Sequence, residues 1–267
     1  MLANLIGGLK QTVRIFTHKD FTKNPDAPRI TELQKRALWL GLINSEQLTA
    51  YIDSLTTGLP KERVIQGLTE AWGICSQDEA FETIDWIRKG GHRVAFNAVL
   101  PYIHIADEAE RNGQIAKMLR ENAEKIIFSA ENQEELEEKF ESELERLTEF
   151  ADNLIACIAE RGDDPFVAFN EANMRQGILA WDLGRLVTIV RMCYDVGCLD
   201  EKTAWDIITS AYEAAVKEFK DWREVAVSYL IGRGAWGGDS MMLHGLYRIA
   251  EKAFESDDSP WKTTPLK

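Results

Sequence analysis

The sequence has little basic charge, and this shortage excludes a large class of functions. It contains 31 Lys and Arg residues against 44 Asp and Glu residues, which gives a formal net charge of −13 at pH 7. Proteins that bind nucleic acids need a basic excess on at least one face, because phosphate contacts supply much of their affinity. We therefore expect no nucleic-acid partner. The acidic balance favours solubility and suits a basic protein partner.

Paired cysteines, clustered metal ligands and long apolar runs are also missing. The four cysteines show neither paired spacing nor the density of a secreted disulfide scaffold, which indicates reduced thiols in a cytoplasmic protein. The four histidines form no metal-binding pattern, and no cofactor motif occurs, so we expect neither a metal nor a cofactor. No stretch approaches the roughly 18 apolar residues of a membrane span, and residues 1–9 make a poor signal peptide. We expect no membrane association.

Strand-like alternation of apolar and polar residues is absent as well, whereas helical periodicity runs through most of the chain. The seven prolines fall where helices should begin or end. The sequence therefore predicts an all-α, compact, multi-helix globular domain with a buried central helix near residues 178–196. We expect residues 1–60 to form a helical extension packed on the core, residues 61–262 to form the main helical domain, and residues 263–267 to form a tail.

The predicted central helix carries three charges although it is apolar on nearly every side. These charges are Asp182, Arg185 and Arg191, and a buried charge is unfavourable unless a partner compensates it. We expect Asp182 to be largely buried and within hydrogen-bond reach of an arginine, either Arg185 or Arg233. Two interpretations follow. The charges form a structural salt-bridge network, or an arginine anchors an anion while Asp182 orients it.

Two further segments combine glycine with charged side chains. Residues 229–239 (YLIGRGAWGGD) place Arg233 and Asp239 among four glycines, which predicts a glycine-rich turn that either joins two helices or binds an anion through its backbone N–H groups. His92 and Arg93 follow a glycine pair. His92 is a candidate general base, with a capping or core role as the alternative. No nucleophile with an orienting carboxylate can be assigned, so we name no catalytic residue.

The acidic excess is concentrated in one segment. Residues 131–150 contain nine glutamates against two basic residues. Apolar residues at helical spacing, among them Leu136 and Phe140, define one face of the segment, so it is predicted to be a long amphipathic surface helix and not a disordered tail. Glutamates away from that face form a candidate partner-binding surface, here called the acidic face. They are Glu134, Glu138, Glu141 and Glu145.

Five short blocks occur in an order that resembles one family of bacterial proteins. The blocks are Trp72-Gly73-Ile74, Gly91-His92-Arg93 with Phe96, Ala180–Arg185 (AWDLGR), Tyr229–Arg233 with Trp236-Gly237-Gly238, and Ser259-Pro260-Trp261. The family is the bacterial domain of unknown function 1266, and the resemblance covers roughly residues 60–262. It implies that the charged and tryptophan positions of these blocks lie together in one cytosolic domain. It implies no activity.

Together these features favour a non-catalytic binding protein of the bacterial cytoplasm. We expect it to neutralise or chaperone a partner protein, as toxin-immunity proteins do, because no catalytic set can be assigned and the acidic face suits attraction of a basic partner. The first alternative is an enzyme that acts on an anionic substrate through Asp182, His92 and the arginines. The second is a structural or oligomeric scaffold. Arginines that line an open cleft would favour the enzyme, and arginines sealed by tryptophans would favour a core network. Nothing in the sequence indicates an oligomeric state.

Overall fold

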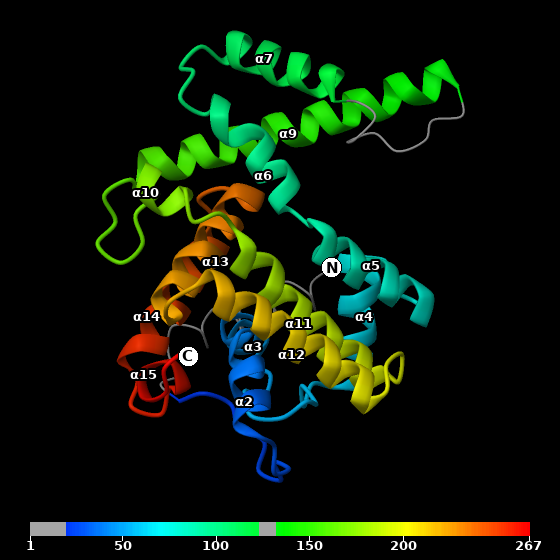
Figure 1. The fold of residues 1–267 in the computed structure, drawn as a ribbon, viewed down its shortest axis with the longest axis vertical. Helices are drawn as coiled ribbons and strands as arrows, with labels where there is room; N and C mark the ends of the chain where they lie inside the picture. The colour runs from blue at the N-terminus through cyan, green and yellow to red at the C-terminus, as the bar shows by residue number, and fades with distance from the viewer. Residues whose placement is uncertain (1–19, 123–131) are drawn as a thin grey trace, which may run out of the picture.

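The computed structural model describes residues 20–122 and 132–267. Within these ranges the regular secondary structure is helical, with no strand, so the predicted all-α class is confirmed (Figure 1). In chain order the elements are α2 (Glu32–Trp39), α3 (Leu42–Leu48), α4 (Lys61–Trp72), α5 (Gln77–Lys89), α6 (Arg93–Val99), the 3-10 turn η1 (Leu100–Tyr102), α7 (Glu108–Glu121), α9 (Gln133–Arg161), α10 (Glu171–Met174), α11 (Leu179–Val196), α12 (Glu201–Glu218), α13 (Trp222–Gly237), α14 (Met241–Glu255) and α15 (Pro260–Thr263).

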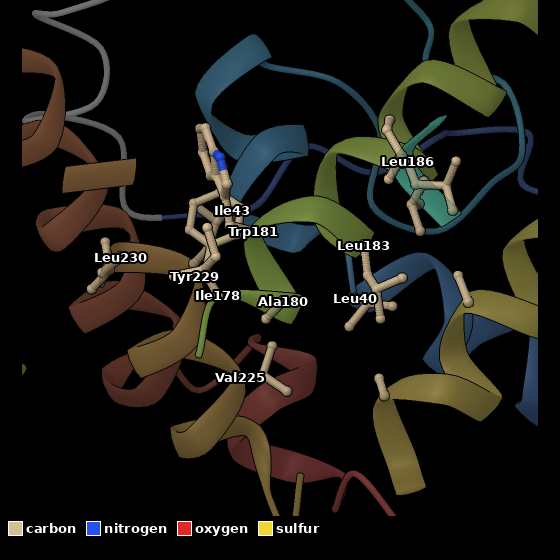
Figure 2. Close-up of a cluster of buried hydrophobic side chains, with 14 of the residues drawn as sticks. Leu40, Ile43, Ile178, Ala180, Trp181, Leu183, Leu186, Val225, Tyr229 and Leu230 are labelled. Carbon is tan, nitrogen blue, oxygen red and sulfur yellow. The ribbon is translucent and has the colours of Figure 1, made fainter. Parts of the chain in front are cut away.

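Helix α11 forms the centre of the molecule, which confirms the buried central helix predicted from the sequence. Every side chain from Ala180 to Cys193 is buried, because α3, α4, α5, α12 and α13 pack around this helix. It ends at Val196, and the C-cap Gly197 has the left-handed backbone (φ 85°) that is typical of a helix C-terminus. Figure 2 shows the apolar core at its N-terminal half, where these side chains lie together: Leu40, Ile43, Ile178, Ala180, Trp181, Leu183, Leu186, Val225, Tyr229 and Leu230.

Residues 229–237 of the segment predicted to be a glycine-rich turn are helical instead. α13 continues through Gly232 and Gly234 to Gly237, and Gly238 (φ 63°) is its C-cap. The two internal glycines make room for neighbouring side chains. A Cβ atom at Gly232 would lie 2.3 Å from Cβ of Trp181, and one at Gly234 would lie 2.5 Å from the ring of Phe169. Close packing in the tertiary structure therefore outweighs the low helix propensity of glycine.

A helical hairpin covers one end of the molecule (Figure 1). α7 and α9 run antiparallel there, and α6 packs against α9 on the side of the central core. α9 begins after Asn132, whose side chain accepts a hydrogen bond from the backbone N–H of Glu135. Its apolar face is half-buried at first and becomes fully buried at Leu147 and Phe150. The glutamates of the acidic face are all exposed.

The first and last described segments share the core with the rest of the chain. Leu38 of α2 and Leu42 of α3 are fully buried. At the other end Leu266 is buried, and its carbonyl oxygen accepts a hydrogen bond from the hydroxyl of Tyr212. Residues 1–19 of the predicted N-terminal extension lie outside the described residues. In the ranges that are described, no helix is both long enough and apolar enough to cross a membrane.

Candidate functional site

Asp182 lies in the first turn of α11 and is the buried acceptor of four hydrogen bonds. Nη2 of Arg185 donates to its carboxylate at 2.5 Å, and Nη1 of Arg93 donates at 2.9 Å. The backbone N–H groups of His92 and Arg93 donate at 3.3 Å each. The predicted burial of Asp182 and its predicted contact with Arg185 are confirmed. Arg233, the other arginine named from the sequence, is not among its partners.

Gly91 brings the start of α6 against this carboxylate. Its φ of 54° lies in the left-handed region that favours glycine. A Cβ atom at this position would also lie 2.6 Å from Oδ2 of Asp182. The absence of a side chain therefore lets the next two backbone N–H groups reach the carboxylate, which explains why a glycine precedes His92.

Arg185 is held by hydrogen bonds along one side of its guanidinium group. Nε donates to the carbonyl oxygen of Trp181 at 3.2 Å, and Nη2 donates to Asp182 and also to Nδ1 of His92, at 2.8 Å. The guanidinium carbon lies 4.3 Å from the ring centroid of Trp181 and 5.2 Å from that of Trp72. Nη1 donates to no described residue. A fixed guanidinium group thus keeps one NH₂ group free of protein partners in the described chain.

His92 serves as a hydrogen-bond acceptor in this network. Burial lowers the pKa of His92 to about 3, and the positive charges of Arg185 and Arg146 act in the same direction. The imidazole is therefore neutral at pH 7, and because Arg185 donates to Nδ1, its proton resides on Nε2. The ring stacks on Phe150 with a centroid distance of 6.1 Å and meets the ring of Trp86 edge-on at 5.1 Å. These contacts fix the orientation of the ring.

The network around Asp182 carries an excess of one positive charge. Burial raises the pKa of Asp182, while Arg185 and Arg93 oppose that rise by attracting its charged form. Burial likewise lowers the pKa of Arg185, and the carboxylate opposes that change. With His92 neutral, two guanidinium groups face one carboxylate. The surplus charge lies in a largely desolvated environment, where an anion is attracted more strongly than in water.

An open cleft of about 580 Å³ lies beside this network and is here called the tryptophan cleft. Arg185 and His92 form part of its wall. Trp86 and Trp236 also line it and are 45% and 49% exposed, although large aromatic side chains are usually mostly buried. The remaining lining residues are Ala71, Trp72, Glu82, Thr83 and Trp181. The cleft therefore combines aromatic walls with a cationic group.

Two other charged residues named from the sequence lie outside the Asp182 network. Arg233 is buried, and its guanidinium carbon lies 5.0 Å from the ring centroid of Trp236. Burial lowers the pKa of Arg233, and its Nη1 has no hydrogen-bond partner among the described residues. Asp239 pairs instead with Arg161 at 2.6 Å and with His244 at 3.3 Å. Arg233 is thus connected to the cleft through Trp236, and Asp239 belongs to a separate ion cluster.

Arg191 anchors a loop and takes no part in the cleft. Its guanidinium group donates to Oγ of Ser45 at 2.8 Å. Burial lowers the pKa of Arg191 to about 10. The other hydrogen bonds go to four carbonyl oxygens of one loop, those of Tyr51, Ser54, Leu55 and Thr56. This arginine therefore holds the loop before α4 against the middle of α11, which supports the structural interpretation for this residue.

The acidic face of α9 is separate from the tryptophan cleft, since none of its four glutamates lines it. The cleft and the acidic face are therefore two distinct candidate surfaces.

Among the residues that the structure describes, no group of three or more His, Cys, Asp or Glu side chains could hold a metal ion.

Sequence reasoning missed Trp86 and Glu82, which reach the cleft from α5. Both lie on the exposed side of this amphipathic helix. A large aromatic residue on the polar side of a helix is the signal that could have identified Trp86, because such a position gives tryptophan no core to pack into. Glu82 lies one helical turn before it, and an exposed glutamate gives no such signal. Trp72, Trp181 and Trp236 were present in the blocks that carry the family resemblance.

The fold and the site define an all-α protein with an aromatic cleft beside a buried ion network. The family model described as Protein of unknown function (DUF1266) matches residues 67–266, a range that includes every residue of the tryptophan cleft and of the Asp182 network. The chain belongs to this family. A search of the curated proteins and a search of the solved structures each give no match.

Proposed function

We propose that this protein is a non-catalytic binding protein of the bacterial cytoplasm that neutralises or chaperones a partner protein, as toxin-immunity proteins do. We place the contact at the tryptophan cleft. The observation that carries the proposal is the pair of half-exposed tryptophans, Trp86 and Trp236, on the wall of an open cleft. Tryptophan is among the side chains in which protein interfaces concentrate their binding energy, and clustered exposed apolar surface is otherwise unfavourable.

The state of the polar groups beside the cleft favours binding over proton transfer. A general base must accept a proton near neutral pH, whereas the pKa of His92 is lowered to about 3 and its Nδ1 already accepts a hydrogen bond from Arg185. Asp182 is fully buried and accepts hydrogen bonds from two arginine side chains. The network is therefore better suited to holding a positive charge in place than to moving a proton.

The negative charge of the acidic face is the observation that favours a partner with a basic surface. Its four glutamates are exposed on the first half of α9, in a protein whose net charge is −13. Complementary charge raises the rate of encounter more than it raises the affinity. In this proposal α9 attracts the partner and the tryptophan cleft provides the main contact.

The test is capture from the source bacterium followed by reconstitution with the purified partner. Wild-type protein is compared with the double variant Trp86→Ala/Trp236→Ala. Phe81→Ala is the matched control, because Phe81 is a 40% exposed aromatic residue on α5 outside the cleft. We expect the double variant to raise the Kd of the purified partner at least tenfold and the control to leave it unchanged.

Equal affinity of the double variant and the wild type would contradict the placement of the contact at the cleft. The enzyme alternative would be favoured if the purified protein turned over an anionic substrate, and if this activity were lost in Arg185→Gln and retained in Phe81→Ala. Both variants need a helical circular dichroism spectrum like that of the wild type for this comparison.

A further inference from the structure

Two residues that line the tryptophan cleft carry hydrogen-bond donors that no described protein group accepts. Nη1 of Arg185 is one, and Nε2–H of His92 is the second. We propose that these donors bind the C-terminal carboxylate of a partner polypeptide, and that the last side chain of this polypeptide is aromatic and packs against the tryptophans. This inference rests on the proposed function and names the group that the cleft recognises.

The charge of the site fits a single carboxylate. Among the described residues Arg185 and Arg93 form ion pairs with one shared carboxylate, that of Asp182, so one positive charge has no carboxylate of its own in direct contact. Glu82 is an exposed carboxylate on the lining of the same cleft. It repels each negative charge on a ligand, so its unfavourable effect is larger for a dianion than for a monoanion. The cleft is therefore suited to a monoanion with an apolar body and is unsuited to a dianion such as a phosphate monoester.

The donors are held in position before any ligand arrives. Arg185 is 7% exposed, and its Nε and Nη2 are fixed by Trp181, Asp182 and His92. Because the guanidinium group is planar, fixing these two nitrogens also fixes the direction of Nη1. Little side-chain entropy is lost when such a group binds a carboxylate. The buried side chain with an unused NH₂ group is what indicates a ligand at this position.

The walls of the cleft fit an aromatic side chain. Trp86 and Trp236 retain about half of their surface exposed, and Trp181 packs within 6.4 Å of Trp236 between ring centroids. Aromatic pairs stabilise each other beyond the area that they bury. A volume of about 580 Å³ lies in the range of pockets that hold small ligands, so the cleft can accommodate a short chain end.

The C-terminal residue of a polypeptide can supply both the carboxylate and the aromatic side chain that the cleft fits. The C-terminal residue carries its carboxylate directly beside its own side chain, and the polypeptide leaves the site in only one direction. An internal Asp or Glu would need two chain exits from a small cleft. The half-exposed tryptophans favour a polypeptide over a free aromatic acid, because the residues that precede the chain end can cover the apolar surface that a small molecule would leave in water.

The test uses calorimetric titration of the full-length protein at pH 7 with N-acetylated six-residue peptides. One peptide ends in phenylalanine with a free carboxylate, the second is its C-terminal amide, and the third ends in alanine with a free carboxylate. We expect the amide and the alanine peptide each to bind at least tenfold more weakly than the first. We expect Arg185→Gln to bind the acid and the amide with similar Kd, Trp236→Ala to weaken the acid at least fivefold, and Phe81→Ala to match the wild type.

Three results would overturn the inference. The first is equal binding of the acid and the amide, or binding of neither up to millimolar concentration. The second is N-acetylphenylalanine binding as tightly as the peptide, which would assign the cleft to a free aromatic acid. The third is full affinity of a partner that lacks its last three residues. If that truncated partner still depends on Trp86 and Trp236, the proposed function stands and only the C-terminal recognition fails.

Discussion

At Asp182, removal of one negative charge would leave two guanidinium groups without their counter-ion. Arg185 is buried and Arg93 is mostly buried, and breaking a buried pair by removing one partner lowers stability by about 3–5 kcal/mol. We expect Asp182→Asn to lower the free energy of unfolding in urea by an amount in this range. The control is Asp206→Asn, because Asp206 pairs with Lys202 on the surface, where a pair contributes about 0–1 kcal/mol. Equal losses in the two variants would contradict the network.

His92 should make stability fall below neutral pH. Its pKa is about 3 in the folded protein, whereas an unfolded histidine titrates near 6.5, so the unfolded chain binds a proton that the folded protein rejects. The stability contributed by the neutral ring is therefore fully present above pH 6.5 and is lost as the pH falls from 6.5 towards 3. The full shift corresponds to about 4–5 kcal/mol.

The urea midpoint measured between pH 7 and pH 4 tests this linkage. We expect it to fall steeply for the wild type and less steeply for His92→Gln, because glutamine is polar but does not titrate. His104→Gln controls for the loss of a histidine in general, because His104 is exposed. Parallel slopes for the wild type and His92→Gln would show that this ring does not govern the acid response.

The requirement for a partner at Asp182 could be predicted from the sequence, but the identity of all its partners could not. A carboxylate on a helix that is apolar all round needs a counter-charge wherever it lies, and Arg185 is three residues away on the same helix. Arg93 is separated from Asp182 by 89 positions. Arg93 reaches Asp182 only because α5 packs against α11 and the turn from α5 into α6 then lies over the carboxylate. The local sequence around either residue does not specify this packing.

At the level of whole helices, α11 could be predicted from the sequence, but the continuation of α13 through its glycines could not. The apolar residues of α11 occur on every side, and this pattern is visible in the sequence itself. The glycines of α13 indicated a turn because helix propensity is a local property. Their actual role is to leave space for Trp181 and Phe169, which come from other segments.

Because glycine makes room for a neighbouring side chain in α13 but not in α7, replacing it by alanine should change the free energy of unfolding in opposite directions in the two helices. Gly232→Ala places a Cβ atom 2.3 Å from Cβ of Trp181, so we expect it to lower the free energy of unfolding by about 1–3 kcal/mol through overpacking. Gly113 in α7 has nothing within 4 Å of the corresponding position. Gly113→Ala should raise the free energy of unfolding by about 0.5–1 kcal/mol, because alanine is the better helix former. Urea denaturation measures both, and stabilisation by Gly232→Ala would contradict the close contact between α11 and α13.

On the scale of the whole molecule, the tryptophan cleft is a product of assembly. Its lining comes from two parts of the chain that are far apart in the sequence, the segment from α4 to the start of α6 and the segment from α11 to α13. Helices α4, α5 and α13 pack against the central helix α11 (Figure 1). The family blocks contained three of its four tryptophans, but the blocks do not distinguish Trp236, which is half-exposed, from Trp181, which is buried. The acidic face could be predicted more completely, because charge and helical periodicity are both local.

The acidic face makes a prediction about association rates with the purified partner. We expect its reversal to lysine to leave the fold intact, since exposed substitutions usually change stability by less than about 0.5 kcal/mol. It should slow association and remove most of the salt dependence, because steering between charges is screened over about 8–10 Å near physiological ionic strength. Stopped-flow measurements at several salt concentrations give both quantities. The four substitutions are Glu134→Lys, Glu138→Lys, Glu141→Lys and Glu145→Lys.

A variant with four acidic residues of α12 changed to lysine distinguishes an effect of the acidic face from an effect of the net charge of the protein. Its four positions are exposed, so either variant changes the formal net charge from −13 to −5. If α9 attracts the partner, the α12 variant should retain most of the wild-type association rate, because its charges lie away from the hairpin end of the molecule (Figure 1). Equal slowing by the two variants would show that overall charge acts and that α9 is only a solvated surface. The α12 substitutions are Glu201→Lys, Asp206→Lys, Glu213→Lys and Glu218→Lys.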